Sequence, residues 1–190
     1  LEGQYAQLTG TGRYQLESSE GTMHGKIAVP DLGVLNSRSD TVLSGHAKAE
    51  GTINLSGEQF DAHLNVNAGD LRFSEHEIET AQALIEINGE SSVGEGITRV
   101  SITNSGEIIE AESSFRFDSD RIVVPEFIVT NRDNVIDGNA EIAYRDSTGR
   151  VEIAASIPDL SSFEPFIRIA LQGSIDGDAE LGGLGDAQSF

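Results

Sequence analysis

The 190-residue sequence contains no cysteine and no tryptophan, and it has only four prolines and one methionine. Without cysteine the chain cannot form disulfides, use a thiolate nucleophile or bind metal through sulfur. No apolar run approaches the roughly 18 residues of a membrane-spanning helix, and no secretory signal opens the chain. Since the chain begins at Leu1 and not at a methionine, we expect it to be a fragment whose signal or anchor lies elsewhere.

Positive charge is also scarce in this sequence. Lysine and arginine total 12 against 32 aspartates and glutamates, which gives a net charge of −20. Nucleic acids and anionic membrane surfaces both bind through concentrated positive charge, so the composition argues against them as partners. A high net charge keeps a large exposed surface soluble. Hydrophobic residues at 37%, together with 21 glycines, are ordinary for a chain that folds.

A stretch near the end of the chain repeats one near its start at a constant offset, the one that relates Pro30 to Pro158. The shared features are an apolar alternation, a Pro-Asp-Leu turn and a closing Leu-x-Gly, which indicate a duplicated structural unit. We therefore predict one repetitive unit over residues 1–190, with internal copies at about residues 10–57 and 138–183. The matched positions are Gly21, Met23, Gly25, Ile27, Val29, Pro30, Asp31, Leu32, Leu43 and Gly45 in the first copy, and Gly149, Val151, Ile153, Ala155, Ile157, Pro158, Asp159, Leu160, Leu171 and Gly173 in the second.

Apolar and polar residues alternate with a period of two in many short segments, a pattern that predicts half-buried strands. In the clearest case Met23, Ile27 and Val29 point one way and Lys26 the other, until Pro30 ends the strand. Short strands at intervals of roughly 8–12 residues are typical of an all-β architecture. We expect short extended pieces within residues 3–16, two strands within 43–66, and further strands at 83–87, 97–102, 109–117, 122–129, 136–144 and 151–157.

The segment from Ser74 to Asn88 is ambiguous. Ser74 and Glu77 mimic a helix capping box, which would begin a helix. Against this, residues 83–87 have the composition of a strand, and the Asn88-Gly89 pair that follows is a favoured turn between strands. We predict a strand over residues 83–87 and leave the preceding residues open.

At most one short helix is expected, over residues 160–167. Asp159 is placed to cap it, and Pro165 keeps it short. After Gly173 the chain is glycine-rich and acidic as far as Gly185, and we expect this end to fray.

Side chains that could carry out catalysis or bind metal are few and scattered. The four histidines show no metal-ligand spacing. The Asp-x-Asp pairs lie in stretches where aspartate usually bonds to the turn backbone. The EF-hand loop, the nucleophile elbow and the phosphate-binding glycine motifs are absent, so we predict no enzyme activity, metal or cofactor. The histidines are His24, His46, His63 and His76, and the aspartate pairs are Asp118 with Asp120 and Asp176 with Asp178.

Strands with one apolar face must bury that face, and the sequence leaves two arrangements open. In a sandwich, a barrel or a helix-covered sheet, the apolar faces form an ordinary packed core. In an elongated, curved and open sheet, they would instead form an apolar groove for lipid tails or for an apolar protein segment. The glycines of the repeat fit both arrangements, because glycine marks bends and bulges.

Several motifs of the two copies resemble those of a known family. In the second copy they are Gly138-Asn139-Ala140-Glu141-Ile142, the alternating strand from Val151 to Ile157, Pro158-Asp159-Leu160-Ser161, Leu171-Gln172-Gly173 and Leu181-Gly182-Gly183. In the first copy they are Leu8-Thr9-Gly10-Thr11-Gly12, Val29-Pro30-Asp31-Leu32 and Leu43-Ser44-Gly45. These motifs resemble the conserved repeats of the bacterial TamB family, the translocation and assembly module subunits of the AsmA-like, bridge-like lipid-transfer group. The two copies with their intervening strands cover nearly the whole chain.

The resemblance implies an elongated groove of stacked β-strands, a β-taco, lined by apolar side chains. A complete protein of this family would be anchored in the inner membrane, cross the periplasm and work with an outer-membrane barrel of the TamA or BamA kind. The family is linked to phospholipid movement towards the outer membrane and to the assembly of outer-membrane proteins and autotransporters. The cargo would be a phospholipid or a nascent outer-membrane protein strand.

Together these patterns predict a periplasmic, non-enzymatic β-groove segment. The alternative is an extracellular, adhesin-like or structural β-solenoid whose apolar face is only packed core. A polysaccharide-active β-helix enzyme fits less well, because aromatic residues make up only 6% of the chain and no acid cluster is evident. The residues predicted to line the groove are Met23, Ile27, Val29, Ile142, Tyr144, Val151, Ile153 and Ile157.

Overall fold

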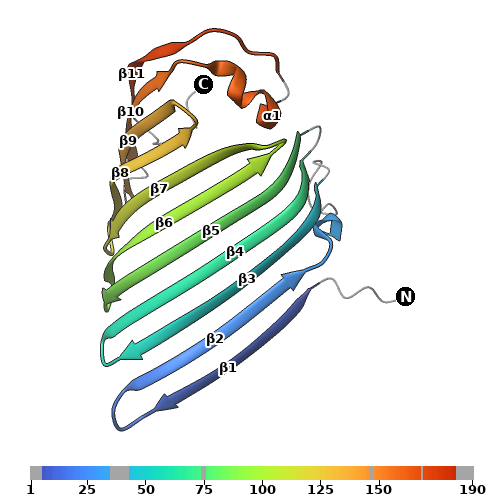
Figure 1. Cartoon of the computed structure of the whole chain (residues 1–190). Helices are drawn as coiled ribbons and strands as arrows, with labels where there is room; N and C mark the ends of the chain where they lie inside the picture. The colour runs from blue at the N-terminus through green and yellow to red at the C-terminus, as the bar shows by residue number, and fades with distance from the viewer. Residues whose placement is uncertain (1–5, 35–42, 74–75, 146–147, 168, 183–190) are drawn as a thin grey trace.

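The chain forms one open antiparallel sheet of 11 strands, in which each strand pairs with its neighbours in the sequence (Figure 1). A computed structural model describes residues 6–34, 43–73, 76–145, 148–167 and 169–182. The predicted all-β class is confirmed, since helical structure is limited to short turns in these residues. The strands are β1 (Gln7–Gln15), β2 (Glu20–Val29), β3 (Leu43–Ser56), β4 (Gln59–Phe73), β5 (His76–Glu90), β6 (Val93–Asn104), β7 (Glu107–Phe117), β8 (Arg121–Asn131), β9 (Asn134–Ala143), β10 (Thr148–Ile157) and β11 (Ile175–Gly182).

Ladder register keeps apolar residues aligned from strand to strand. Met23 of β2 lies opposite Ile53 of β3, and the same row continues through β4, β5 and β6 to Phe115 of β7. Because side chains alternate between the two sides of a strand, residues that lie opposite one another share a face. The sheet therefore has an apolar face and, on its other side, a polar face with most of the charged residues. The large residues of the apolar face are Leu8, Tyr14, Met23, Ile27, Val29, Ile53, Leu55, Phe60, Leu64, Val66, Ile85, Ile87, Val100, Ile102, Ile109, Phe115, Phe117, Ile122, Val124, Phe127, Val129, Ile136, Ile142, Val151, Ile153, Ile157, Ile175 and Leu181.

The sheet bends towards its C-terminal end. Figure 1 shows β8 to β11 turned away from the direction of β1 to β7. Ladder register shifts between Ser114 and Arg116 in β7 and between Val124 and Phe127 in β8, where this turn occurs. In both ladders the extra residue lies in β8, which has one residue more than its partner between these positions. An extra residue in one strand of a pair bends that strand and increases its twist, so this bulge accounts for the bend.

The two copies of the sequence repeat have corresponding strands and registers. β2 and β10 begin and end at positions related by the same offset that relates Pro30 to Pro158. The cross-strand pair Met23 and Ile53 corresponds, at this offset, to the cross-strand pair Val151 and Leu181. Each copy therefore contributes three consecutive strands, β1 to β3 in the first and β9 to β11 in the second.

The turns that follow β2 and β10 also correspond. Asp31 and Asp159 each accept a hydrogen bond from the backbone amide two residues later, at 2.7 Å and 2.9 Å. The closing glycines are alike as well, with φ of +114° at Gly45 and +107° at Gly173. Few residues other than glycine adopt such angles, and Gly45 lies at a third register shift, in β3.

Most of the ambiguous segment from Ser74 to Asn88 lies in strand β5. Its residues form a strand from His76 to Glu90, so the helical alternative is wrong there, while Ser74 lies outside the described residues. The predicted Asn88-Gly89 turn is also wrong, because both residues pair with β6 inside the sheet. The chain turns instead at residues 91–92, where the Ser91 amide donates to the Glu58 carbonyl of the neighbouring hairpin.

The glycine-rich residues 175–182 form strand β11, so the expected fraying is wrong for them, while residues 183–185 lie outside the described residues. This strand pairs with β10 from Ile175, opposite Ile157, to Gly182, opposite Arg150. The hydrogen-bond partners of β11 lie in β10, which precedes the short helical turns η2 and α1. The composition of residues 175–182 does not predict this pairing.

The predicted helix is present as two short pieces. Residues Leu160–Phe163 form a 3-10 helix, η2, and Glu164–Ile167 form one turn of α-helix, α1. Asp159 caps η2, as the sequence predicted, by accepting from the Ser161 amide.

Candidate functional site

The aromatic residues of the apolar face lie over glycines of the neighbouring strand. In each directly opposite pair, a Cβ added to the glycine would come within 2.5 to 2.8 Å of the aromatic ring. The ring therefore fills the space that a side chain would need, and it lies along the sheet instead of standing upright. Such packing covers the backbone and keeps the face shallow. The pairs are Tyr14–Gly21, Phe60–Gly89, Phe115–Gly96, Phe117–Gly94 and Phe127–Gly138.

The predicted groove residues lie on this face in two separate groups. Six strands, β3 to β8, separate the groups, so the structure does not bring all eight residues into one site. Tyr144 directly follows the end of β9. Ile157 is 7% exposed and buried, whereas Met23 and Ile142 keep 48% and 45% exposed. Their role as groove residues remains a prediction. The first group is Met23, Ile27 and Val29, and the second is Ile142, Val151, Ile153 and Ile157.

The strands between the two groups supply most of the apolar face. Ile85 and Ile87 of β5, for example, continue the rows of β4 and β6 without a break. Ile53 and Leu64 remain 39% and 37% exposed, so the middle of the face is accessible. The sequence prediction named residues of the repeated copies alone and missed these, although the same period-two alternation marks them.

One end of the apolar face is covered by the η2–α1 segment, residues 158–167. Three asparagines at this end of the sheet, Asn104, Asn131 and Asn134, are 6%, 1% and 2% exposed. Asn134 Nδ2 donates to the Asp159 carbonyl at 2.9 Å and to Ser162 Oγ at 2.6 Å. Its Oδ1 accepts from the Asp159 amide at 3.0 Å. A buried amide that is satisfied in this way fixes the segment against the start of β9.

Asn104, at the end of β6, holds the other end of the same segment. Its Nδ2 donates to the Pro165 carbonyl and, at 2.7 Å, to the Glu77 carbonyl of β5. Helix α1 also contacts β5 and lies beside the strand ends there (Figure 1). The η2–α1 segment thus runs from the end of β10 to β5, past the ends of the strands between them.

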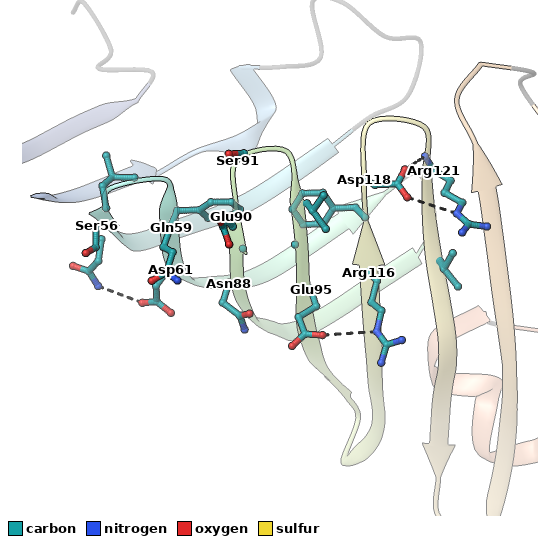
Figure 2. A pocket seen from close by; sticks show the side chains of 18 of the residues that line it. Ser56, Gln59, Asp61, Asn88, Glu90, Ser91, Glu95, Arg116, Asp118 and Arg121 are labelled. Carbon is teal, nitrogen blue, oxygen red and sulfur yellow. Dashed lines mark hydrogen bonds and ion pairs between the residues drawn. The ribbon is translucent and has the colours of Figure 1, made fainter. Parts of the chain in front are cut away.

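The opposite end of the sheet contains a hollow of about 1220 Å³ at the β3–β4, β5–β6 and β7–β8 hairpins (Figure 2). Leu55, Phe60 and Phe117 line it from the apolar face. Polar-face residues also line the hollow, because it lies at the ends of the strands, where side chains of both faces border it. Figure 2 shows a row of these polar residues across four neighbouring strands, namely Asp61, Asn88, Glu95 and Arg116.

The rim of this hollow is held by exposed ion pairs. Arg121 lies 2.9 Å from Glu141 and 3.7 Å from Asp118. The backbone amides of Asp120 and Arg121 donate to Asp118 and hold the pKa of its carboxyl below its usual value. The hydrogen bond to Glu141 raises the pKa of Arg121. Exposed pairs of this kind add little stability, and their effect is to position the side chains.

The polar face carries ion pairs that link neighbouring strands. His63 lies 3.0 Å from Asp61 and 3.4 Å from Glu86, and Arg99 joins Glu86 to Glu112. Smaller hollows of about 370 to 490 Å³ lie among side chains of this face. Across the described ranges, no histidine and carboxylate groups are arranged to hold a metal ion. In the same ranges, no helix has the length and hydropathy of a membrane-spanning one.

No protein-family model, no curated protein and no solved structure matches this chain.

Proposed function

We propose that the apolar face shelters the acyl chains of phospholipids, and that the chain is a groove-forming segment of a periplasmic protein of the TamB kind. The observation that carries the proposal is the apolar face itself, which continues across all 11 strands. Large side chains along it, such as Met23, Ile53 and Ile142, stay 39% to 48% exposed. A contiguous exposed apolar surface of this extent is typical of an interaction site.

Acyl chains suit this face better than the second predicted cargo, a nascent protein strand. Backbone N–H and C=O groups of the inner strands are used in the ladders, so the face offers side chains alone. A protein strand seated on it would leave its own backbone groups without partners. A methylene group needs no partner and gains about 0.8 kcal/mol when buried. Contacts spread over an open face allow a chain to move along it.

The bend of the sheet supports a curved, groove-like shape. Figure 1 shows β8 to β11 turned away from the direction of β1 to β7. The η2–α1 segment links the two parts, because it follows Ile157 of β10 and its Pro165 shares the Asn104 amide of β6 with Glu77 of β5.

The topology favours a groove over the alternative β-solenoid with a packed core. Strands of β-helix repeats stack in parallel, whereas the ten ladders here are antiparallel and join neighbours in the sequence. The η2–α1 segment covers one end of the apolar face, while large side chains elsewhere on it, such as Met23 and Ile53, stay exposed.

In this proposal the full-length protein is anchored in the inner membrane, and the segment lies in the periplasm. It works with an outer-membrane barrel of the TamA or BamA kind to move phospholipid towards the outer membrane. Passage along an apolar face makes and breaks no covalent bond, so the segment acts without catalytic groups. The net charge of −20 keeps the outer surface soluble while the apolar face stays exposed.

Photo-crosslinking from strand β10 tests the proposal. A photoreactive amino acid replaces Ile153 on the apolar face or, as the matched control, Ala154 on the polar face of the same strand. The protein is irradiated in cells, purified and analysed by mass spectrometry. We expect phospholipid adducts from position 153 and none from position 154. Adducts to protein neighbours alone from position 153, or equal lipid labelling at both positions, would refute acyl-chain shelter on this face.

A further inference from the structure

The two ends of the apolar face differ in what they offer to the polar part of a bound amphiphile. At the η2–α1 end, Asn104, Asn131 and Asn134 are buried, and their amides donate to backbone carbonyls or to Ser162. Among the described residues, no buried side-chain nitrogen or oxygen lacks a hydrogen-bond partner. The protein itself uses the buried amides of this end, and the η2–α1 segment closes it to a headgroup.

The hairpin end of the face is open. In the neighbouring strands β9 and β10, Ile142 near the hairpins keeps 45% exposed, whereas Ile157 at the η2–α1 end keeps 7%. The hollow of about 1220 Å³ lies at the hairpin end, where Leu55, Phe60 and Phe117 of the apolar face and several charged residues border it together. A molecule with its apolar part on the face and its charged part in the hollow would contact both kinds of side chain.

The charges around the hollow have both signs, with carboxylates in excess. Arg121 is held by two carboxylates, whereas Arg116 pairs among the described residues with Glu95 alone, at 3.7 Å, and its side chain is 74% exposed. Glu90 forms no ion pair with another described residue. Figure 2 shows Glu90, Glu95 and Arg116 on three neighbouring strands. The hollow thus offers a guanidinium to a phosphate and an unpaired carboxylate to a cation. The carboxylates that border it are Asp61, Glu90, Glu95, Asp118 and Glu141.

We propose that this hollow holds the zwitterionic headgroup of a phospholipid whose acyl chains lie along the strands and point towards the η2–α1 segment. The inference rests on the proposed function and adds to it the class of lipid and its orientation. The phosphate lies near Arg116, because guanidinium groups match phosphate oxygens in shape and charge. The ammonium group lies near Glu90, since opposite charges attract. An anionic headgroup without an ammonium would leave the excess of carboxylates unpaired.

Orientation along the strands follows from where the face meets polar groups. Across the strands the apolar rows continue, so a headgroup in the middle of the sheet would lie on apolar side chains such as Ile53, Leu64 and Ile85. Its charges would have no partners there, which is unfavourable. Along the strands the face ends at the hairpins, where charged side chains are exposed.

Two photoreactive phosphatidylethanolamines test the orientation on the purified chain. One carries a diazirine on an acyl chain close to the glycerol ester, and the other carries it at the end of that chain, so both keep the natural headgroup. After irradiation, peptide mass spectrometry locates the adducts. We expect the first lipid to label residues beside the β3–β4, β5–β6 and β7–β8 turns. The second should label the same strands nearer to the η2–α1 segment.

Competition tests the headgroup. Unlabelled phosphatidylethanolamine and phosphatidylglycerol with the same acyl chains compete with the photoreactive lipid, and we expect phosphatidylethanolamine to compete better. Arg116→Gln should weaken its competition about two- to fivefold, and Glu90→Gln should reduce its advantage over phosphatidylglycerol by a similar factor, as one exposed ion pair predicts. The matched controls Arg99→Gln and Glu110→Gln lie on the polar face of β6 and β7, away from the hollow, and should change neither.

These results separate the inference from the proposed function. Adducts of the two photoreactive lipids at overlapping positions or in reversed order, equal competition by the two headgroups, or unchanged competition in either hollow variant would overturn the inference and leave acyl-chain shelter standing. If neither photoreactive lipid labels the chain, both the headgroup site and acyl-chain shelter are wrong.

Discussion

Replacement of Gly138 by alanine tests the packing that shapes the apolar face. Gly138 lies in β9 opposite Phe127 of β8 and Ile153 of β10. An added Cβ would stand 2.8 Å from Phe127 Cζ and would collide with the carbonyl oxygen of Glu152. The second neighbour is backbone, so the clash cannot be relieved by a change of rotamer. Strand β9 must shift away from β10 or distort.

The size of the effect follows from overpacking. Extra carbon forced into a well-packed site typically costs about 1 to 3 kcal/mol. For a chain of 190 residues this corresponds to a fall of about 2 to 12 °C in the unfolding temperature. Gly25 and Gly177 are the matched controls, because an added Cβ there meets no atom within 4 Å. Alanine at these two positions should be neutral or stabilise by up to about 1 kcal/mol, since it restricts the unfolded chain.

Urea and thermal unfolding of the purified chain, followed by circular dichroism, measure these differences. We expect Gly138→Ala to unfold at a lower urea concentration than wild type, with Gly25→Ala and Gly177→Ala at or above it. The double variant Phe127→Leu/Gly138→Ala should recover only part of the loss, because the Glu152 carbonyl remains in place. If Gly138→Ala were as stable as Gly177→Ala, the ring-over-glycine account of this face would be wrong.

Three further predictions concern the apolar face and the segment that covers its end. Ile153→Asp should remain folded by circular dichroism yet lose co-purified phospholipid, because its cross-strand neighbours are the small Gly138 and Ala179; cooperative unfolding at lower urea with no lipid change would contradict an open face. Asn134→Asp replaces the amide that donates to the Asp159 carbonyl and should cost about 1 to 3 kcal/mol, seen as faster amide hydrogen exchange in residues 158–167 but not in β3 and β4. The Ser161 hydroxyl and amide lower the pKa of Asp159, so its contribution to stability is present above about pH 4 and is lost as the pH falls through the lower folded value. Wild type should therefore lose more stability than Asp159→Asn between about pH 4 and pH 2, and parallel loss in the two proteins would exclude this role.

Local pattern was sufficient for much of the fold. Period-two alternation identified strands at most of the observed positions and placed Met23, Ile27, Ile142 and Ile153 on the apolar side. Turn chemistry identified Asp159 as a cap, because a carboxylate and an amide two residues later meet without help from the rest of the chain.

Other features depended on which strands became neighbours. The Asn88-Gly89 pair has ideal turn chemistry, yet β4 and β6 extend past it and hold it within the sheet, and Gly89 is covered by Phe60. Residues 175–182 form β11 because they pair with β10, although the glycine content of the segment predicts fraying.

The sequence by itself determined the all-β class, the apolar and polar sides of the strands and the internal repeat. Each of these follows from the spacing of apolar, polar and turn residues along the chain. Only the tertiary structure decided the order of the strands, the ring-over-glycine pairs and the burial of Asn134. The ring-over-glycine pairs join residues 7 to 29 positions apart, and Asn134 bonds to residues 25 and 28 positions away. These partners are set by ladder hydrogen bonds and register, which the local pattern of residues does not specify. The apolar face is continuous because the register of each ladder places the apolar side of one strand beside the apolar side of the next.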